Sequence, residues 1–210
     1  MIVVGLTGGI ASGKTFVTKY LEKLKIPVCD SDQIISDLYT SEDKKFITFL
    51  LKNGFKNSVS KKKISKKIIR DRVFNNIDKK IILETYLHKE VEKKRNFFLK
   101  KNKNKKIVFL DIPLLFEKNL ENICDVICCT IAPTYIRERR AIQRKGMKKN
   151  IFKKIIKNQT TDSYRKKKSD YLINTNQTKR KTCLQVDSLI YDILNKKNER
   201  NSFRHRNNRP

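Results

Sequence analysis

The stretch that decides the fold is MIVVGLTGGIASGKT, residues 1–15 of a 210-residue chain. Residues 2–6 form a short apolar run rich in β-branched side chains, which predicts a buried strand. Residues 8–15 then match the pattern G-x-x-x-x-G-K-[ST] in full. A helical pattern with apolar side chains on one face follows from Val17 to Leu24. A strand, a glycine-rich turn and a helix in this order indicate the start of an α/β fold.

The glycine pattern is typical of a loop that binds phosphate. Glycines let the backbone curl so that successive N–H groups point at phosphate oxygens, and the following helix adds the positive end of its dipole. Lys14 is then expected to reach the β- and γ-phosphates of ATP, and the Thr15 hydroxyl to bind Mg²⁺. The residues expected to contact ATP in this loop are Gly8, Gly9, Ile10, Ala11, Ser12, Gly13, Lys14, Thr15 and Phe16.

Short apolar runs alternate with helical patterns along the rest of the chain. Strands are predicted at residues 26–29, 107–112, 125–131 and 171–173. Buried strands separated by helices predict a P-loop NTPase type of α/β fold, with a mostly parallel sheet and helices on both faces. The expected core comprises residues 1–42, 105–135 and 168–195, with basic helical insertions at 43–104 and 136–167. A basic tail at 196–210 is expected to be disordered.

The composition limits the classes of protein that the chain can belong to. Its net charge is +29, with 50 basic and 21 acidic residues, which favours a polyanionic partner. An AT-rich genome is an alternative source of this charge, because 37 Lys, 25 Ile and 18 Asn stand against 3 Ala. Five cysteines without a C-x-x-C pair argue against a zinc site or a disulfide framework. Without a long apolar run or a signal peptide, a cytoplasmic protein that does not span a membrane is expected.

Carboxylates follow two of the predicted strands. Asp111 ends a strand that resembles a Walker B strand and would link to the magnesium ion, although a turn-capping role is the alternative. The next residue, Ile112, is not acidic, which favours phosphoryl transfer to a bound acceptor over ATP hydrolysis coupled to motion. Asp30 and Asp32 follow the second strand, where a carboxylate can accept a proton from an attacking hydroxyl. Their spacing does not decide which one does so and which one caps the next helix.

Four motifs together resemble those of the dephospho-CoA kinases. They are LTGGIASGK at residues 6–14, Asp30-Ser31-Asp32, Leu87-His88, and PLLFE at residues 113–117. The resemblance covers about residues 1–195 and implies transfer of the ATP γ-phosphoryl group to the ribose 3′-hydroxyl of dephospho-CoA. It also implies that the insertion at 43–104 binds the CoA moiety and that residues 136–167 form a lid.

The resemblance also implies roles for single residues. Asp32 matches the general base and Lys14 acts with it in catalysis. Arg140 and Arg144 match lid arginines that contact ATP, and Asn174 and Asn176 match a loop near the adenine. The residues implied to contact the acceptor substrate are Thr7, Asp32, Arg70, His88, Pro113, Leu114 and Glu117.

The chain departs from the family pattern at four positions. Ala11 replaces a common glycine, which is tolerated where φ is negative. Lys89 replaces a proline, Asp162 stands where an arginine is common, and Gln177 replaces a glycine. The last two changes put the lid and adenine contacts in question, but not the chemistry of the phosphate loop.

Two other functions fit parts of the pattern. A nucleoside monophosphate kinase would share the layout but use a different acceptor. A nucleic-acid-binding protein would explain the charge, but the basic segments contain few aromatic residues and no recognised module, so no specific nucleic acid partner is expected. A GTPase is disfavoured because no Asn-Lys-x-Asp signature occurs. The sequence carries no signal for an oligomeric state.

Overall fold

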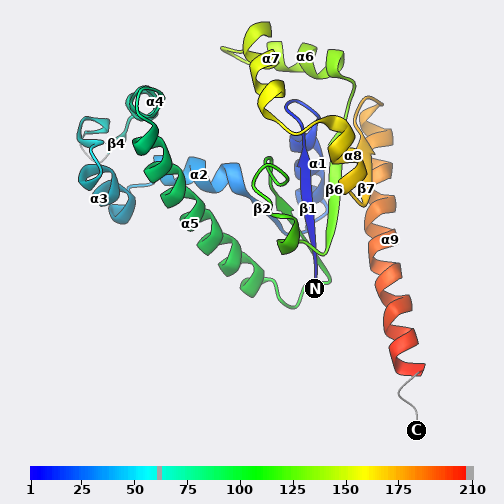
Figure 1. The fold of residues 1–210 in the computed structure, drawn as a ribbon. Helices are drawn as coiled ribbons and strands as arrows, with labels where there is room; N and C mark the ends of the chain where they lie inside the picture. The colour runs from blue at the N-terminus through cyan, green and yellow to red at the C-terminus, as the bar shows by residue number, and fades with distance from the viewer. Residues whose placement is uncertain (61–62, 207–210) are drawn as a thin grey trace. The chain divides into compact units, whose positions relative to one another are not determined.

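The computed structural model describes residues 1–60 and 63–206 of the chain (Figure 1). It contains a five-stranded sheet in the order β2-β5-β1-β6-β7. β1 pairs in parallel with β5 and β6, and β6 pairs in parallel with β7. The strands are β1 (Ile2–Gly8), β2 (Val28–Asp30), β5 (Ile107–Asp111), β6 (Val126–Ile131) and β7 (Tyr171–Asn174). The predicted α/β class with a parallel sheet is therefore confirmed.

The chain divides into two compact units, Met1–Cys29 with Asn102–Pro210, and Asp30–Lys101. The helices of the first unit are α1 (Lys14–Lys23), α6 (Thr134–Ile142), α7 (Lys149–Asn158), α8 (Asp162–Lys168) and α9 (Lys179–Arg206), with a 3₁₀ turn at Glu121–Ile123. The second unit holds α2 (Ser31–Thr40), α3 (Lys44–Lys52), a 3₁₀ turn at Lys56–Ser58, β3 (Val59–Ser60), β4 (Lys63–Ile64), α4 (Lys66–Phe74) and α5 (Ile77–Lys101).

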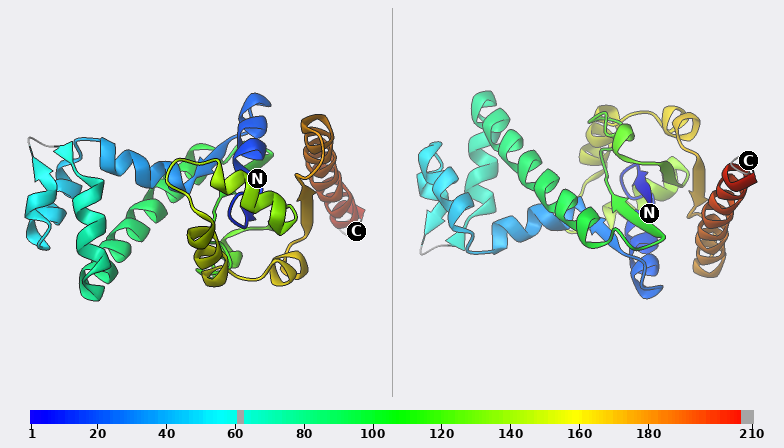
Figure 2. Two further views of the ribbon diagram at one scale, coloured as in Figure 1. Left: turned by 90° about the horizontal axis from the view of Figure 1, so that it is seen from above. Right: turned by 90° about the horizontal axis from the view of Figure 1, so that it is seen from below.

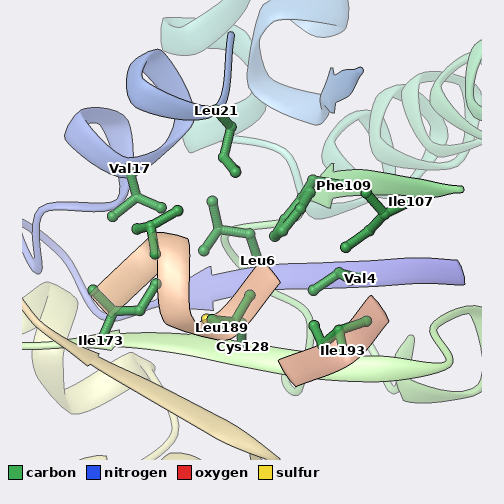
Figure 3. Packing of buried hydrophobic residues seen from close by; sticks show 11 residues of the cluster. Val4, Leu6, Val17, Leu21, Ile107, Phe109, Cys128, Ile173, Leu189 and Ile193 are labelled. Atoms are coloured by element: carbon green, nitrogen blue, oxygen red, sulfur yellow. The ribbon is translucent and has the colours of Figure 1, made fainter. Parts of the chain in front are cut away.

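The core of the first unit lies between the sheet and the helices α1 and α9 (Figure 3). Val4 and Leu6 of β1 are completely buried, and they pack with Phe109 of β5 and Leu21 of α1. Each such side chain contributes about 1.5–3 kcal/mol by leaving water. Helix α9 runs beside the edge strand β7 (Figure 2). Because alternate strand residues face opposite sides, this packing leaves the other face of β6 to helix α8.

The second unit has its own apolar core, built from aromatic and aliphatic side chains. The Phe49 and Tyr86 rings stack with their centroids 4.0 Å apart, and Phe46 packs edge-on against Tyr39 at 5.3 Å. Leu38 of α2 is buried in the same cluster. Helix α2 therefore packs with the helical unit, whereas the sequence placed residues 30–42 in the nucleotide-binding core. The sequence also missed the small antiparallel hairpin of β3 and β4, because strands of two residues carry no periodicity.

Helix boundaries differ from the prediction at both basic segments of the first unit. The sequence pattern predicts a basic helix from Pro133 to about Lys145, whereas α6 ends at Ile142, two residues before Arg144. α9 continues to Arg206, so residues 196–206 are helical and the predicted disorder is wrong for them. No glycine or proline interrupts the chain between Lys179 and Arg206, so nothing ends the helix earlier. Residues 207–210 of the predicted tail lie outside the described residues.

The cysteines confirm one further prediction. All five cysteines are free, and Cys29, Cys128 and Cys129 are buried, as expected for core thiols. Burial raises the pKa of the Cys129 thiol to about 11, despite the nearby positive charge of Arg165. Among the described residues, no helix combines the length and the apolar character needed to cross a membrane.

Candidate active site

The phosphate loop connects the carboxyl end of β1 to the first turn of α1. Gly13 precedes α1 with a φ of 92°, in the left-handed region that favours glycine. A Cβ atom at this position would also lie 2.8 Å from the Thr175 side chain. The Thr175 hydroxyl donates to the Ser12 carbonyl over 2.6 Å, and the Ser12 and Thr130 hydroxyls are 2.7 Å apart. The loop is thus fixed from β6 and from the segment after β7.

Lys14 and Asp111 form the charged centre of this loop. The Lys14 ammonium donates to Asp111 Oδ1, and the Thr18 hydroxyl donates to Oδ2 over 2.6 Å. The Asp111 residue is only 1% exposed, whereas Lys14 is partly exposed. A buried carboxylate of this kind must be paired, and Lys14 supplies the charge. Asp111 therefore holds Lys14 at the start of α1, which is more than the turn-capping role allows.

The residues around the loop fit Mg²⁺ bound together with nucleotide phosphates. Thr15 is exposed on the first turn of α1, where its hydroxyl can serve as a ligand, and Asp111 lies next to Lys14. Within residues 1–60 and 63–206, no group of three or more His, Cys, Asp or Glu side chains could hold a metal on its own. Mg²⁺ is usually bound through one or two protein groups, waters and substrate phosphates, and Thr15 and Asp111 are groups of that kind.

Ala11 departs from the expected backbone conformation. An alanine is expected to be tolerated here where φ is negative, but the φ of Ala11 is 57°. A left-handed conformation costs a non-glycine residue about 1–2 kcal/mol. Ala11 is buried and packs with Ala141 and Phe152, so its methyl group recovers part of that cost.

The structure distinguishes the two carboxylates that follow β2. Asp30 is the N-cap of α2, and its Oδ1 accepts a hydrogen bond of 3.0 Å from the Gln33 amide. Asp32 lies in the first turn of the same helix and lines a groove on the second unit. The capping role therefore belongs to Asp30, and Asp32 is the carboxylate that faces a possible ligand.

The groove that Asp32 lines has a volume of about 550 Å³ and lies between α2, α4 and α5. Its wall combines apolar and basic side chains with one acidic residue: Asp32, Ile35, Ser36, Tyr39, Lys66, Lys67, Ile69, Arg70, Val73 and Leu83. The Lys66 ammonium lies 5.4 Å from the centroid of the Tyr39 ring. The groove brings together Asp32 and Arg70, two of the predicted substrate contacts, from helices about 40 residues apart in the sequence. Basic groups beside an aromatic wall suit an anionic ligand that also has an apolar or aromatic part.

Other predicted substrate contacts have different surroundings. Thr7 is completely buried and its hydroxyl donates to the Pro113 carbonyl over 3.3 Å, so its side chain holds β1 to that segment rather than meeting a ligand. Leu114 is 41% exposed beside it. His88 is exposed on α5 and does not line the groove.

Glu117 belongs to a network of buried charges. Its Oε1 accepts hydrogen bonds from the Thr160 amide at 2.9 Å and the Thr160 hydroxyl at 3.0 Å, and forms an ion pair of 2.9 Å with Arg165. Burial opposes ionisation of Glu117, but these hydrogen bonds and Arg165 outweigh it and lower its pKa. The structure thus shows Glu117 bound to Thr160 and Arg165 of the segment that the sequence predicts as a lid, and a contact with substrate stays a prediction.

The predicted lid and adenine residues lie near the phosphate loop to different degrees. Arg140 of α6 binds Thr175 through both terminal nitrogens, at 2.9 Å to the hydroxyl and 2.6 Å to the carbonyl. Asn174 ends β7 and accepts a hydrogen bond from the Asn176 amide. Arg144 is exposed and lies beyond the end of α6, so it is not part of the helix that carries Arg140.

Sequence reasoning missed several residues that hold the site. Thr175 links Ser12 to Arg140, and Thr18 holds Asp111. Gln159 accepts a hydrogen bond of 3.0 Å from the Ile10 amide in the phosphate loop. The threonines lie at a strand end and one turn into a helix, which are positions without a distinctive sequence signal. Of these three residues, only Gln159, a lone glutamine between two basic helices, could have been chosen as a candidate from the sequence.

Comparison with known proteins supports one family. The family model for dephospho-CoA kinase matches residues 2–181. A dephospho-CoA kinase of Fusobacterium nucleatum is 35% identical over 84% of this chain and 90% of its own length. One of Bartonella quintana is 33% identical over 92% of this chain and 99% of its own length.

Solved structures share the fold. TT1252 from Thermus thermophilus has a TM-score of 0.77 and 25% identity, covering 92% of this chain and 97% of its own. The dephospho-CoA kinase from Campylobacter jejuni has a TM-score of 0.69 and 22% identity, covering 93% of this chain and 98% of its own.

Proposed function

The chain belongs to the dephospho-CoA kinase family, and we propose that ATP binds at the phosphate loop and dephospho-CoA in the groove lined by Asp32 and Arg70. The reaction is the ATP-dependent phosphorylation of dephospho-CoA, the final step of CoA biosynthesis. We assign the ribose 3′-hydroxyl as the acceptor. One observation carries the assignment of the two sites: Asp30 caps α2, whereas Asp32 lines the groove.

Asp32 is the proposed general base. Asp30 caps α2, whereas Asp32 lines the groove, so Asp32 is the carboxylate of the pair to which we assign the proton of the attacking hydroxyl. Arg70, Lys66 and Lys67 provide positive charge in the same groove for the phosphates of the acceptor. Tyr39 and Ile35 provide the apolar wall against which a less polar part of the acceptor can pack.

Lys14 and the loop amides stabilise the phosphoryl group as it moves. Lys14 leaves Asp111 for the phosphate oxygens or is shared between them, so that its charge offsets the charge that develops in the transition state. Thr15, with Asp111 behind it, would hold Mg²⁺, which would supply positive charge to the phosphates of ATP. Asn174 and Asn176 are proposed to lie near the adenine, and Arg140 near the phosphates.

The alternatives make different predictions for the acceptor. One coupled assay with dephospho-CoA, AMP, CMP and dTMP at equal concentrations separates the proposed reaction from a nucleoside monophosphate kinase. Turnover confined to dephospho-CoA is expected. Faster turnover of any of the three monophosphates would contradict the assignment of the groove. Specific nucleic acid binding and a membrane partner are not proposed, and the cytoplasm remains the predicted location.

Asp32→Asn and Asp30→Asn form a matched pair for the same assay. Asparagine is also a good N-cap, so Asp30→Asn should keep α2 and most of the activity. Asp32→Asn keeps the shape but cannot accept the proton, and kcat should fall by about 10²–10⁴-fold with little change in ATP binding. A mild effect at Asp32 together with a crippling one at Asp30 would show that the base is the other carboxylate.

A further inference from the structure

Two arginines of the lid are buried almost completely. Arg137 of α6 is 3% exposed and Arg165 of α8 is 2% exposed. Arginine is rarely buried to this degree unless it is paired, because a charged group loses its hydration there. The Nε atoms of both side chains are buried without a hydrogen-bond partner. Their position therefore needs an explanation beyond general basicity.

One carboxylate joins the two guanidinium groups. Asp162 Oδ2 lies 2.6 Å from Arg137 Nη2, and Asp162 Oδ1 lies 3.2 Å from Arg165 Nη1. Arg165 continues the chain of contacts to Glu117. Burial lowers the pKa of Arg137, and Asp162 opposes that change. The Asp162 side chain is 40% exposed, so this carboxylate pairs with the two buried guanidinium groups from the solvent side.

The second terminal nitrogen of the Arg137 guanidinium, Nη1, lies against the phosphate loop. A Cβ atom added to Gly9 would be 2.2 Å from Arg137 Nη1 and 3.3 Å from Arg165 Nη1. The hydrogen bonds of Arg137 to other described residues all use Nη2, to Asp162 and Thr134. The next loop residue, Ile10, is held by Gln159. Arg137 therefore presents Nη1 to the loop that receives the phosphates, with its other terminal nitrogen anchored.

We propose that Arg137 binds a β- or γ-phosphate oxygen of ATP through Nη1 and that Asp162 is the positioning residue that aims it. This inference rests on the proposed nucleotide site and adds a residue to it. A guanidinium fixed by a carboxylate on one side keeps its direction without a ligand, so less conformational entropy is lost when a phosphate binds. A side chain at Gly9 would displace the guanidinium from that space.

The same geometry explains the departure at residue 162. The family resemblance led us to expect an arginine at this position, and the aspartate looked like the loss of a positive charge near ATP. In the structure, Asp162 is opposite Arg137 on the neighbouring helix. The lid thus keeps a guanidinium at the phosphate loop, now supplied from α6 and oriented from α8.

The competing explanation is that Arg137 and Asp162 only clamp the lid. Only the proposed contact requires a β- or γ-phosphate, which ATP has and AMP lacks. Titrations with ATP and with AMP by calorimetry therefore separate the two explanations. Arg137→Gln should weaken ATP binding by about 10- to 100-fold, the value of one charge-assisted hydrogen bond. AMP binding should change by less than about threefold. Arg139→Gln, an exposed neighbour on α6, is the matched control and should leave both affinities unchanged.

The positioning role of Asp162 is tested with variants of Asp162 alone and in combination with a change at Arg137. Asp162→Asn should raise KM for ATP with a smaller change in kcat, and Asp162→Glu should recover most of the loss. Combined with Arg137→Gln, Asp162→Asn should add little, because its effect passes through the missing arginine. The variant Arg137→Gln/Asp162→Arg places a guanidinium on the other helix and should regain part of the ATP affinity.

Equal weakening of ATP and AMP binding by Arg137→Gln would overturn the proposal, as would full additivity in the double variant. A melting temperature measured for each variant identifies any that fail to fold, and Asp162→Asn, at a partly exposed position, then decides the question on its own. Lys14→Ala reports on the nucleotide site separately. If Lys14→Ala abolishes ATP binding while Arg137→Gln does not alter it, the nucleotide site stands and only this inference fails.

Discussion

Replacing Glu117 by glutamine tests whether the buried charge network stabilises the nucleotide-binding unit. Glu117→Gln preserves the shape of the side chain and removes its charge. In the wild-type protein, Glu117 Oε1 accepts two hydrogen bonds from Thr160 and forms an ion pair with Arg165, which is 2% exposed. The variant leaves Arg165 with Asp162 as its remaining carboxylate, at 3.2 Å.

The size of the effect follows from these contacts. Removing one partner of a buried ion pair costs about 3–5 kcal/mol when the other charge is left alone. Arg165 keeps Asp162, and the glutamine oxygen still accepts neutral hydrogen bonds of about 0.5–1.5 kcal/mol. We therefore expect a loss of about 2–3 kcal/mol in the free energy of unfolding. For a chain of this size that lowers the melting temperature by about 5–10 °C.

Thermal unfolding followed by circular dichroism measures the effect, with Glu22→Gln as the control. Glu22 is exposed on α1 of the same unit, and its replacement should change stability by less than about 0.5 kcal/mol. The pKa of Glu117 is lowered in the folded state, so its stabilising effect is present above its ordinary pKa of 4.5. That effect is lost as the pH falls through the folded-state pKa, and the gap between the wild-type protein and Glu117→Gln should close there.

Two results would refute this reasoning. Equal melting temperatures for Glu117→Gln and Glu22→Gln at pH 7 would show that the buried ion pair contributes nothing beyond a neutral contact. Alternatively, a gap that is constant from pH 7 down to pH 3 would show that lost packing, and not charge, causes the destabilisation.

Three further substitutions address the nucleotide site. Lys14→Ala should lower kcat by about 10²-fold or more, because it removes a preorganised charge, and turnover like that of the wild type would exclude the phosphate-loop assignment. Arg140→Ala should lower kcat/KM for ATP about tenfold through loss of the contact to Thr175, while exposed Arg139→Ala should be nearly silent; equal values would remove Arg140 from the site. Gly13→Ala should weaken ATP binding at least tenfold in a titration, since a Cβ atom would lie 2.8 Å from the Thr175 side chain, and unchanged affinity would show that the loop adapts.

The parts of the fold that could be predicted from the sequence are those in which one chain segment carries the whole signal. Residues 2–15 contain a buried strand, glycines at fixed spacing and the start of a helix, and the structure follows that order. Residues 107–111 are buried at every position, as a central parallel strand requires. Asp111 could be placed at the site because the strand that carries it lies next to β1.

The rest depends on contacts between distant segments. Asp30 caps α2 because its side chain accepts a hydrogen bond from the Gln33 backbone amide, which the spacing of Asp30 and Asp32 does not reveal. Helix α2 joins the second unit because Leu38 packs with Phe46, although its polarity suits either unit. The left-handed backbone at Ala11 is set by the curl of the loop and not by the residue, since alanine has no preference for it.

Asp162 shows why a departure from a family pattern cannot be interpreted one position at a time. Taken alone, an acidic residue in place of an arginine subtracts charge from a site that binds a polyanion, and predicts weaker ATP binding. Taken with Arg137, 25 positions away in the sequence, it leaves the guanidinium in place and fixes its direction. Charge compensation of this kind keeps a positive charge at the phosphate loop although residue 162 is acidic. The arginines of α6 were therefore open to interpretation as a solvated basic face until the carboxylate opposite them was located.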